Sequence, residues 1–318
     1  MGRQLFEPVR SSIELTSTLD ELVSELYTDC PKAVAFTYAM PEFTPQYEPS
    51  AHVNVANVEE HTATETSLQP FSQYVKQFTS VQQYTEESPS YTEAEVKLIE
   101  RTTRQQATSD TWQQHRLGGI SASVVYRVHT VMAFKKAPSA TAETKRHLVR
   151  DITKPKDISR VPAVKYGREN EPIAADEYYR LQQESHQLLK VELCGLFVDR
   201  KQIYLCASPD QVVSCDCCGQ GLLETKCPKS CEHSSPQTTT LEYLVRDETN
   251  KLTLHHNHKY FTQVQMQMAM TGYTWCDFFV YSPVDYFLEW ITFDRDFWES
   301  LRQECSDFFY AEVLISLI

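Results

Sequence analysis

Glycine is scarce in this chain, which has only 8 glycines among its 318 residues. Neither the GxxxxGK(S/T) phosphate loop nor the GxGxxG dinucleotide fingerprint occurs. Both motifs need glycines because the backbone must approach a phosphate closely. The sequence therefore argues against nucleotide-triphosphate hydrolysis.

Long apolar runs are also absent. No stretch approaches the roughly 18 apolar residues that a membrane helix needs, and residues 1–6 lack the apolar core of a signal peptide. We therefore expect an intracellular protein without a membrane partner, and the sequence does not separate nucleus from cytoplasm. In such a compartment the ten cysteines are expected to be free thiols, with metal binding as the alternative.

Positive charge is in deficit, since the formal net charge is −13, which argues against a nucleic-acid partner. Its distribution removes much of this conflict, because residues 1–110 carry a net charge of −10 and leave −3 for residues 111–318. Residues 135–168 contain ten Lys or Arg against three acidic residues. This basic stretch is either a phosphate-binding face or a solvated loop, and charge alone does not decide between them.

Composition divides the chain into two parts. Residues 41–90 are rich in Thr, Gln, Ser, Tyr and Glu, which is typical of a poorly ordered linker. We therefore expect an N-terminal extension over residues 1–91, partly disordered and without an assigned function, and a folded domain over residues 92–318. The apolar fraction of 41% is sufficient for its core.

Apolar periodicity in the second part predicts alternating helices and strands. The expected helices cover residues 92–107, 121–134, 167–185, 259–271 and 294–310, and the expected strands cover residues 188–198, 203–207, 211–215, 222–227, 275–281 and 287–293. This order predicts an α/β (α+β) fold with a central mixed β-sheet flanked by helices.

Two acidic residues and a lysine lie beside apolar strand sequences. Asp210 ends a Ser-Pro-Asp turn, and Glu224 and Lys226 lie two residues apart on a later strand. Alternation sends Glu224 and Lys226 to one face, while Thr225 points away and leaves its carbonyl free. Carboxylates are natural ligands of Mg²⁺, and a lysine can orient and acidify a water that attacks phosphorus. The pattern predicts a metal-dependent nuclease.

The alternative is a surface hairpin whose charges are solvated and paired across strands. Apolar neighbours favour the metal site, because Val212 and Val213 follow Asp210, and Leu222 and Leu223 precede Glu224. Strands of this kind are buried, and a buried strand rarely carries unpaired acid without a reason.

Arg116 and Ser123 lie on either side of a Gly-Gly turn that leads into a predicted helix. A guanidinium offers a planar fork for a phosphate, and free amides at a helix start favour the same anion. A terminal 5′-phosphate is therefore a reasonable ligand. The alternative is a salt-bridged arginine at a corner of the core, which is favoured without other support.

Two predicted helices carry further candidate residues. Glu171 lies early in one of them and either completes a metal site or stabilises the first helical turn. Gln263 and Gln267 share one face of another helix. Such a face suggests the wall of a site, although a solvent-facing row of glutamines is the usual explanation.

Cysteines gather between the two acidic positions and just beyond them. The residues considered for zinc are Cys215, Cys217, Cys218, Cys227 and Cys231. Their C-x-C-C spacing differs from the paired C-x-x-C that is typical of tetrahedral zinc sites. Reduced thiols are therefore favoured, and a structural Zn²⁺ is the alternative.

Five segments, taken in order, resemble the YqaJ-type viral recombinase and lambda exonuclease family of the PD-(D/E)XK nuclease superfamily. They are WxxxRLGxIxAS over residues 112–123, GxxxExxA over 167–174, SPD over 208–210, LExKCP over 223–228 and YxxQVQ over 260–265. Their common order is more specific than any single segment. The resemblance implies a restriction-endonuclease-like PD-(D/E)XK core.

The same resemblance implies roles for particular residues. Mg²⁺ or Mn²⁺ would be bound by Asp210, Glu224, the Thr225 carbonyl and Glu171; Lys226 would position the hydrolytic water, Gln263 would be the active-site glutamine, and Arg116 and Ser123 would take the 5′-terminal phosphate. The implied function is 5′-to-3′ exonucleolytic hydrolysis of DNA in recombination or repair. Lambda exonuclease is a ring-shaped trimer, so a homotrimer is one expectation. The alternatives are a structure-selective endonuclease on the same core and a catalytically weak DNA-binding or zinc-stabilised interaction module.

Overall fold

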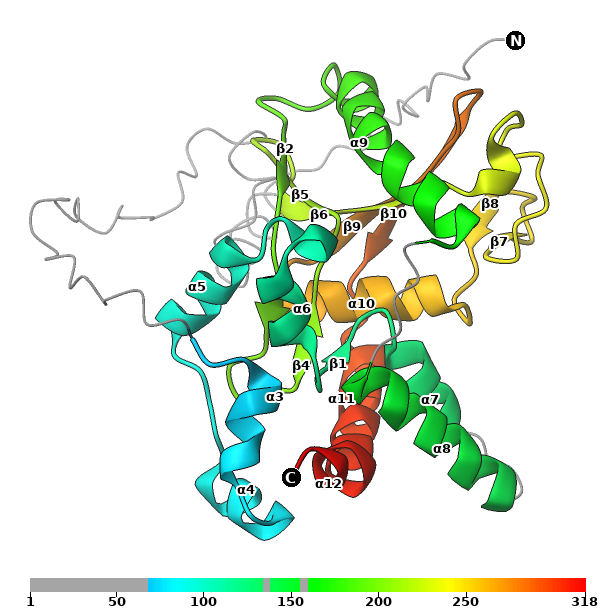
Figure 1. Cartoon of the computed structure of the whole chain (residues 1–318). Helices are drawn as coiled ribbons and strands as arrows, with labels where there is room; N and C mark the ends of the chain where they lie inside the picture. Colours follow the sequence, from blue (N-terminus) through cyan, green and yellow to red (C-terminus); the bar gives the residue numbers. More distant parts are fainter. Residues whose placement is uncertain (1–67, 134–137, 155–159) are drawn as a thin grey trace, which may run out of the picture. The chain divides into compact units, whose positions relative to one another are not determined.

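The computed structural model describes residues 68–133, 138–154 and 160–318 (Figure 1). Residues 1–67, which make up most of the expected N-terminal extension, lie outside the described residues. In the part of the chain that the structure describes, no helix is long and apolar enough to cross a membrane.

A five-stranded sheet in the order β10-β9-β6-β5-β2 forms the centre of the fold. Its strands are β2 (Lys190–Leu193), β5 (Gln211–Cys215), β6 (Gly219–Lys226), β9 (Trp275–Tyr281) and β10 (Tyr286–Thr292). β6 and β9 pair in parallel, and the other neighbours pair antiparallel. A parallel pair needs a long crossover, and here it contains α10 (Lys259–Thr271). The expected mixed sheet is confirmed.

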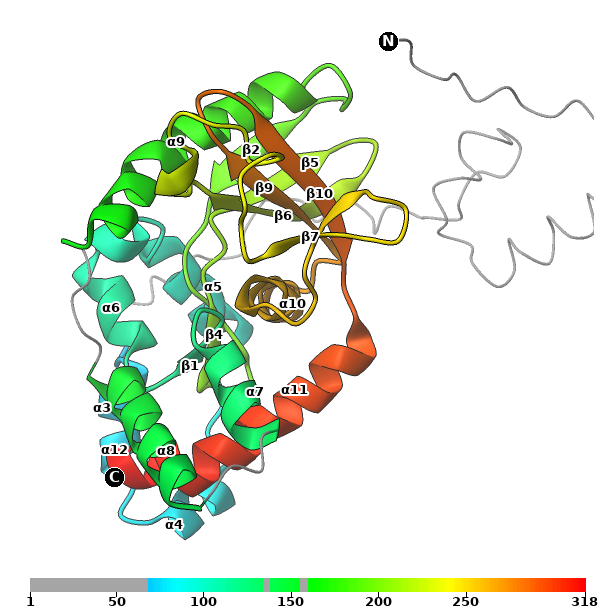
Figure 2. The same ribbon diagram turned by 90° about the vertical axis from the view of Figure 1, so that its right-hand side faces the viewer.

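The helices α9 (Pro162–Gln182) and α10 cover opposite faces of this sheet (Figure 2). Leu222 of β6 packs in the core that contains Val264 and Met268 of α10, whereas the next residue, Leu223, packs in the core that contains Tyr178 of α9. This alternation follows from the two-residue period of a strand. Residues 224 and 226 therefore share the α10 side with Leu222.

A third core lies among helices that surround a small sheet in the order β1-β4-β3. The strands are β1 (Ile120–Ser121), β3 (Phe197–Val198) and β4 (Leu205–Ala207), and the helices are α3 (Phe71–Tyr74), α4 (Val81–Glu87), α5 (Glu93–Thr102), α6 (Asp110–Arg116), α7 (Val125–Ala133), α8 (Pro138–Thr153), α11 (Arg295–Phe308) and α12 (Leu314–Leu317). A π-helical turn, Phe309–Val313, joins α11 to α12. At the centre of this core the rings of Tyr204 and Phe309 stack with centroids 3.8 Å apart.

The segment just before the expected folded domain also contributes to this core. Phe71, Val75, Phe78 and Tyr84 are at most 3% exposed and pack with residues of α11 and α12. Burying four large apolar side chains provides free energy that offsets the conformational entropy lost when this segment is ordered. The expected linker character therefore does not hold for the described residues from Phe71 onward.

Two local expectations were wrong, and one hairpin was not expected. The described part of the basic stretch is not a loop, because α8 is a helix that buries Leu148 and Ile152 one turn apart. The helix expected from residue 121 begins at Val125, because β1 pairs in parallel with β4. The short hairpin β7 (Leu244–Arg246) and β8 (Leu252–Leu254) was not predicted, since three-residue strands give too few alternations.

Candidate active site

Glu224 is buried between the central sheet and α10, with only 1% of the residue exposed. Gln263 Nε2 donates to its Oε1 at 2.6 Å, and Gln267 Nε2 donates to its Oε2 at 2.7 Å. Lys226 Nζ forms an ion pair with Oε1 and lies 4.8 Å from the centroid of the Tyr260 ring. Donors from two elements therefore fix both oxygens of this carboxylate.

Asp210 lies opposite Glu224 at the end of the β5–β6 ladder. The last pair of this antiparallel ladder is Gln211 with Leu223, so the residue before Gln211 faces the residue after Leu223. The Thr225 N–H donates to Asp210 Oδ2 at 2.7 Å. Since that amide lies between Glu224 and Lys226, the two carboxylates are held next to each other by the backbone of one strand. The sequence places these residues 14 positions apart, and the hairpin brings them together.

The turn that presents Asp210 is braced by three side chains. Gln106 Nε2 donates to the Pro209 carbonyl at 2.8 Å, and Cys194 Sγ contacts the same carbonyl oxygen at 3.3 Å. Trp112 Nε1 donates to Ser208 Oγ at 2.7 Å. Because a turn with satisfied polar groups keeps one conformation, these contacts fix the direction of the following carboxylate.

Glu171 of α9 lies close enough to Glu224 and Lys226 to be influenced by their charges. Burial raises the pKa of Glu171, and the charge of Glu224 raises it further while Lys226 opposes the effect. Burial likewise raises the pKa of Asp210 well above its usual range, with Glu224 the next cause. Burial works against the charge of Lys226, but Glu224 and Asp210 outweigh it and raise the lysine pKa. Three carboxylates thus face one ammonium, which leaves an excess of negative charge in a desolvated place.

This donor set fits a hard divalent cation. Carboxylate and carbonyl oxygens are the ligands that Mg²⁺ and Mn²⁺ prefer, and a cation would offset the burial and the repulsion that raise the pKa values of Glu171 and Asp210. Lys226 Nζ also contacts the Thr225 carbonyl oxygen at 3.2 Å. The ammonium therefore lies against two of the oxygens that were expected to bind the metal.

Arg116 is the last residue of α6. The parallel strands β1 and β4 end at the same edge of the small sheet, where Ser123 follows β1 and Asp210 follows β4. Arg116 Nη2 donates to Ser121 Oγ at 2.9 Å and also to Ser123 Oγ, and its guanidinium carbon lies 4.8 Å from the centroid of the Trp112 ring. Burial lowers its pKa. Among the described residues no carboxylate pairs with Arg116, in contrast to the salt-bridged alternative. A half-buried guanidinium held by hydroxyls and a ring is suited to an anionic ligand.

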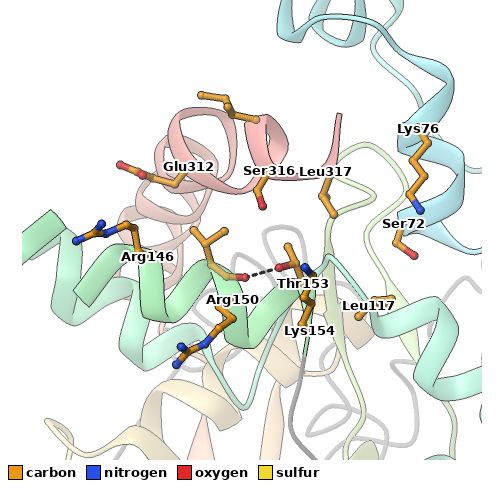
Figure 3. A pocket seen from close by; sticks show the side chains of 12 residues that line it. Ser72, Lys76, Leu117, Arg146, Arg150, Thr153, Lys154, Glu312, Ser316 and Leu317 are labelled. Carbon is orange, nitrogen blue, oxygen red and sulfur yellow. Dashed lines mark hydrogen bonds between the residues drawn. The ribbon is translucent and has the colours of Figure 1, made fainter. Parts of the chain in front are cut away.

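A positively charged cavity of about 540 Å³ lies beside Leu117, which directly follows Arg116 (Figure 3). Its basic lining residues are Lys76, Arg146, Arg150 and Lys154. Glu312 also lines it, and this acid is paired with Lys145 at 2.7 Å. Part of the predicted basic stretch therefore faces a cavity and does not extend into solvent as a loop.

The structure separates the five cysteines that were considered for zinc. Cys215 and Cys217 lie with their Sγ atoms 3.4 Å apart, and Cys218 lies 3.6 Å from Cys217. Cys227 packs in the core beneath α9, and Cys231 packs in the core beside α10. Including these two in one zinc site was wrong, because Cys227 and Cys231 pack among apolar side chains of two separate cores.

Three residues of these sites were not predicted. Gln267 was recognised as sharing a face with Gln263 but was not assigned to the site; its position one turn later was the available signal. Ser121 has the two-residue strand spacing to Ser123, which could have indicated it. His186 lies next to the cysteines, and no local pattern in the sequence indicates this.

The mixed sheet, the Ser-Pro-Asp turn and the Glu-x-Lys strand have the arrangement that the resemblance to PD-(D/E)XK nucleases implies. Residues 111–274 match the family model of the YqaJ-like viral recombinase domain, which is more than half of the chain. The chain therefore belongs to the YqaJ-like viral recombinase family, and the resemblance inferred from its motifs is confirmed.

Solved structures with similar folds include several exonucleases. An alkaline exonuclease from Laribacter hongkongensis is 28% identical over 66% of this chain and 94% of its own, with a TM-score of 0.48. The shutoff and exonuclease protein from Kaposi's sarcoma-associated herpesvirus is 13% identical over 70% of this chain and 73% of its own, with a TM-score of 0.45. A phage-related exonuclease from Haemophilus somnus is 11% identical over 62% of this chain and 95% of its own, with a TM-score of 0.40. A comparison with curated proteins gives no match.

Proposed function

We propose that this protein is a metal-dependent deoxyribonuclease that degrades DNA from a 5′ end, in recombination or repair. The observation that carries the proposal is the pair Asp210 and Glu224, held next to each other by the Thr225 backbone and with Lys226 ion-paired to Glu224, in a chain of the YqaJ-like family. We assign the activity to residues 92–318, with residues 1–91 as an extension whose helices α3 and α4 pack against that domain.

The residues of the site divide the work of hydrolysis. Mg²⁺ or Mn²⁺, held by Glu171, Asp210, Glu224 and the Thr225 carbonyl, would neutralise charge that develops on the scissile phosphate and lower the pKa of a bound water. The Lys226 ammonium donates a hydrogen bond that orients the attacking water. Water adds to phosphorus and the bond to the 3′ oxygen breaks, which leaves a 5′-phosphate and a 3′-hydroxyl.

Two glutamines of α10 act on Glu224 and not on DNA. Gln263 and Gln267 each donate to one of its oxygens, so the carboxylate keeps its orientation whether or not a cation is bound. Partners of metal ligands generally fix ligand geometry in this way. Both are positioning residues in this proposal.

Arg116, Ser121 and Ser123 form the grip for a terminal 5′-phosphate. Guanidinium and hydroxyl groups are matched donors for phosphate oxygens, and the described residues give Arg116 no competing acid. Trp112 contacts Arg116 and also donates to Ser208, so the grip is joined to the turn that presents Asp210. The basic cavity beside Leu117 continues the positive surface and would neutralise backbone phosphates of a bound duplex.

A DNA-digestion panel tests the proposal. The substrates are linear duplexes with a 5′-phosphate or a 5′-hydroxyl and a closed circle, each incubated with Mg²⁺, Mn²⁺ or a chelator. We expect mononucleotides from the phosphorylated linear duplex with either metal, slower release from the hydroxyl duplex, and no cleavage in chelator. Nicking or linearising of the circle would instead favour the structure-selective endonuclease.

Two substitutions make the test specific. Asp210→Asn keeps the size of the side chain and removes its charge, whereas Lys226→Ala removes the ammonium together with its methylene stem. We expect each substitution to abolish detectable cleavage. Lys201→Ala is the matched control, because Lys201 is exposed and makes only a backbone contact to Asp199. Unchanged cleavage in either site variant would refute the catalytic assignment.

A further inference from the structure

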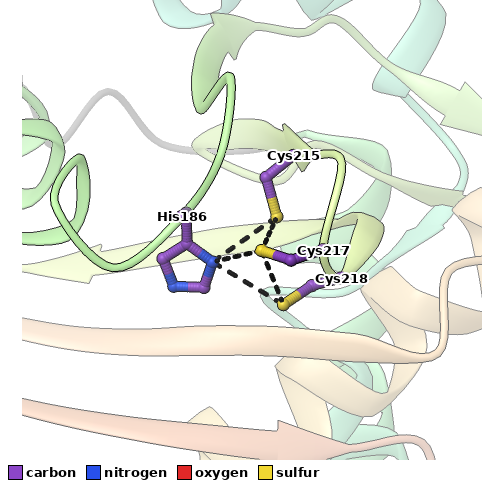
Figure 4. A group of neighbouring side chains, drawn as sticks. All are labelled: His186, Cys215, Cys217 and Cys218. Carbon is purple, nitrogen blue, oxygen red and sulfur yellow. Dashed lines mark hydrogen bonds between the residues drawn. The ribbon is translucent and has the colours of Figure 1, made fainter. Parts of the chain in front are cut away.

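Four metal-ligating side chains gather at the tip of the β5–β6 hairpin, away from the carboxylates. They are His186, Cys215, Cys217 and Cys218 (Figure 4), and their donor atoms all lie within 4.8 Å of one another. We call this group the cysteine–histidine cluster. The histidine comes from the turn after α9, and the three cysteines come from the end of β5 and the turn before β6.

Distances within the cluster match the edges of a metal coordination tetrahedron. His186 Nδ1 lies 3.4 Å from the Sγ atoms of Cys215 and Cys217 and 3.6 Å from that of Cys218. A tetrahedral Zn²⁺ with bonds of about 2.3 Å to sulfur and about 2.0 Å to nitrogen has ligand-to-ligand edges of about 3.5–3.8 Å. Neutral thiols have no comparable reason to converge on one imidazole nitrogen, because S–H donors form only weak hydrogen bonds.

The backbone around the cluster is shaped to keep this convergence. The Asp216 N–H donates to the Gln187 carbonyl at 3.0 Å, which joins the turn after α9 to the hairpin tip. Gly219 has a φ of +72°, a conformation that glycine adopts without strain, and it reverses the chain directly after Cys218. Trp275 Nε1 donates to the Cys218 carbonyl at 3.3 Å. The three cysteines are therefore held by contacts that do not involve their sulfur atoms.

We propose that the cysteine–histidine cluster binds one structural Zn²⁺ through three thiolates and His186 Nδ1. Zinc fits this set because soft thiolates with one imidazole in a closed tetrahedron are typical of structural zinc sites. Binding releases the three thiol protons to solvent. The spacing C-x-C-C differs from two C-x-x-C pairs because the fourth ligand is supplied by a turn 29 residues before Cys215.

The ion would clamp α9 to the hairpin that carries the catalytic acids. Asp210 and Cys215 are five residues apart along β5, which is roughly 17 Å at about 3.3 Å per residue. The zinc therefore lies outside the reaction and acts on the fold. Its existence does not depend on the proposed nuclease activity, since the ligands and the test are separate from the carboxylate site.

Metal analysis of the full chain tests this site. The protein is purified in reductant without an immobilised-metal affinity resin and is dialysed briefly against a weak chelator to remove Mg²⁺. Its metal content per chain is then measured by inductively coupled plasma mass spectrometry. We expect one zinc per chain in the wild type and in the control Cys227→Ala, which removes a hairpin cysteine outside the cluster. We expect most of the zinc to be lost in Cys217→Ser and in His186→Ala; Cys217 is exposed, so its replacement leaves the core intact.

A spectroscopic measurement on the wild type covers the case in which a variant fails to fold. Protein produced with Co²⁺ in place of zinc should show the intense visible bands of tetrahedral cobalt with thiolate charge transfer. Zinc-free wild-type protein, equal zinc in wild type and Cys217→Ser, iron in place of zinc, or octahedral cobalt spectra would each overturn the proposal. So would a disulfide between cluster cysteines, detected by mass spectrometry after alkylation under the same reducing conditions.

Discussion

Gln267 gives the sharpest test of how the active site is positioned. It is fully buried on α10 and donates to Glu224 Oε2 at 2.7 Å. Gln267→Leu removes this donor and leaves a buried carboxylate oxygen without a partner, which costs about 1.5–3 kcal/mol. Because Glu224 is a proposed metal ligand, we expect a loss of about 10–100-fold in apparent Mg²⁺ affinity or in kcat, as for other partners of metal ligands.

A matched control lies two residues away on the same helix. Gln265 is equally buried, but it donates to the Thr292 carbonyl and accepts from the Asp294 N–H. Gln265→Leu should therefore lower stability by a similar amount, about 1.5–3 kcal/mol, and leave kcat and Mg²⁺ dependence per folded molecule nearly unchanged. Urea unfolding gives the stabilities, and digestion rates across a Mg²⁺ titration give the activities.

Comparing the two variants shows whether Gln267 orients Glu224 or only contributes to the packing of α10. Equal losses of activity in both, after correction for the folded fraction, would show that α10 supports the site only through general packing. Wild-type Mg²⁺ dependence in Gln267→Leu would likewise refute the idea that the glutamine orients Glu224. Gln267→Glu provides a further contrast, because a fourth carboxylate next to Glu224 should lower activity by repulsion without removing side-chain volume.

Three further outcomes are expected. Arg116→Lys keeps the positive charge but loses the planar fork of the guanidinium. The ratio of initial rates on 5′-phosphorylated and 5′-hydroxyl duplexes should therefore fall about tenfold or more. An unchanged ratio would show that Arg116 does not recognise the phosphate. Burial raises the pKa of Asp277 to about 6, so this carboxyl binds a proton more tightly in the folded protein than in the unfolded chain. Its contribution to the free energy of unfolding should therefore fall by about 3 kcal/mol as pH rises from about 4 to 6. Asp277→Asn, which can still accept a hydrogen bond from Tyr178, should lose this fall in urea titrations, and a pH profile identical to the wild type would contradict the prediction. In Gly221→Ala the new Cβ would lie 2.2 Å from the Trp275 ring, so the free energy of unfolding should drop by about 1–3 kcal/mol, and a drop no larger than that of exposed Gln220→Ala would refute the close approach.

The arrangement explains how an acidic protein can act on DNA. The proposed phosphate grip at Arg116 is adjacent in the chain to Leu117, which lines the basic cavity. The three acids that repel DNA are also those that the donor set assigns to a cation. Local charge, and not the net charge of −13, therefore governs where a polyanion can approach.

Much of the secondary structure near the active site was predictable from sequence. The expected helix over residues 259–271 and strand over residues 275–281 have the observed limits of α10 and β9, because long apolar elements with a clear period carry a strong signal. The strand β1 and the hairpin β7–β8 were not predictable, since two or three residues cannot establish a period.

Local periodicity also determined part of the site. Alternation alone placed Glu224 and Lys226 on one face, and helical spacing placed Gln263 and Gln267 together. These two faces meet because the crossover between β6 and β9 lays α10 across the strand, which is a feature of the fold and not of either element. Periodicity describes one element at a time, and it contains no information about which element lies opposite.

The cysteines show the same division most clearly. A gathering of thiols near the hairpin tip was predictable from the sequence, since three cysteines lie within four residues there. Only the fold brought His186 to them and kept Cys227 and Cys231 in separate cores. A metal site needs ligands that converge in space. The turn after α9 lies beside the hairpin because β2, which follows it, pairs with β5, and no local sequence pattern specifies that pairing.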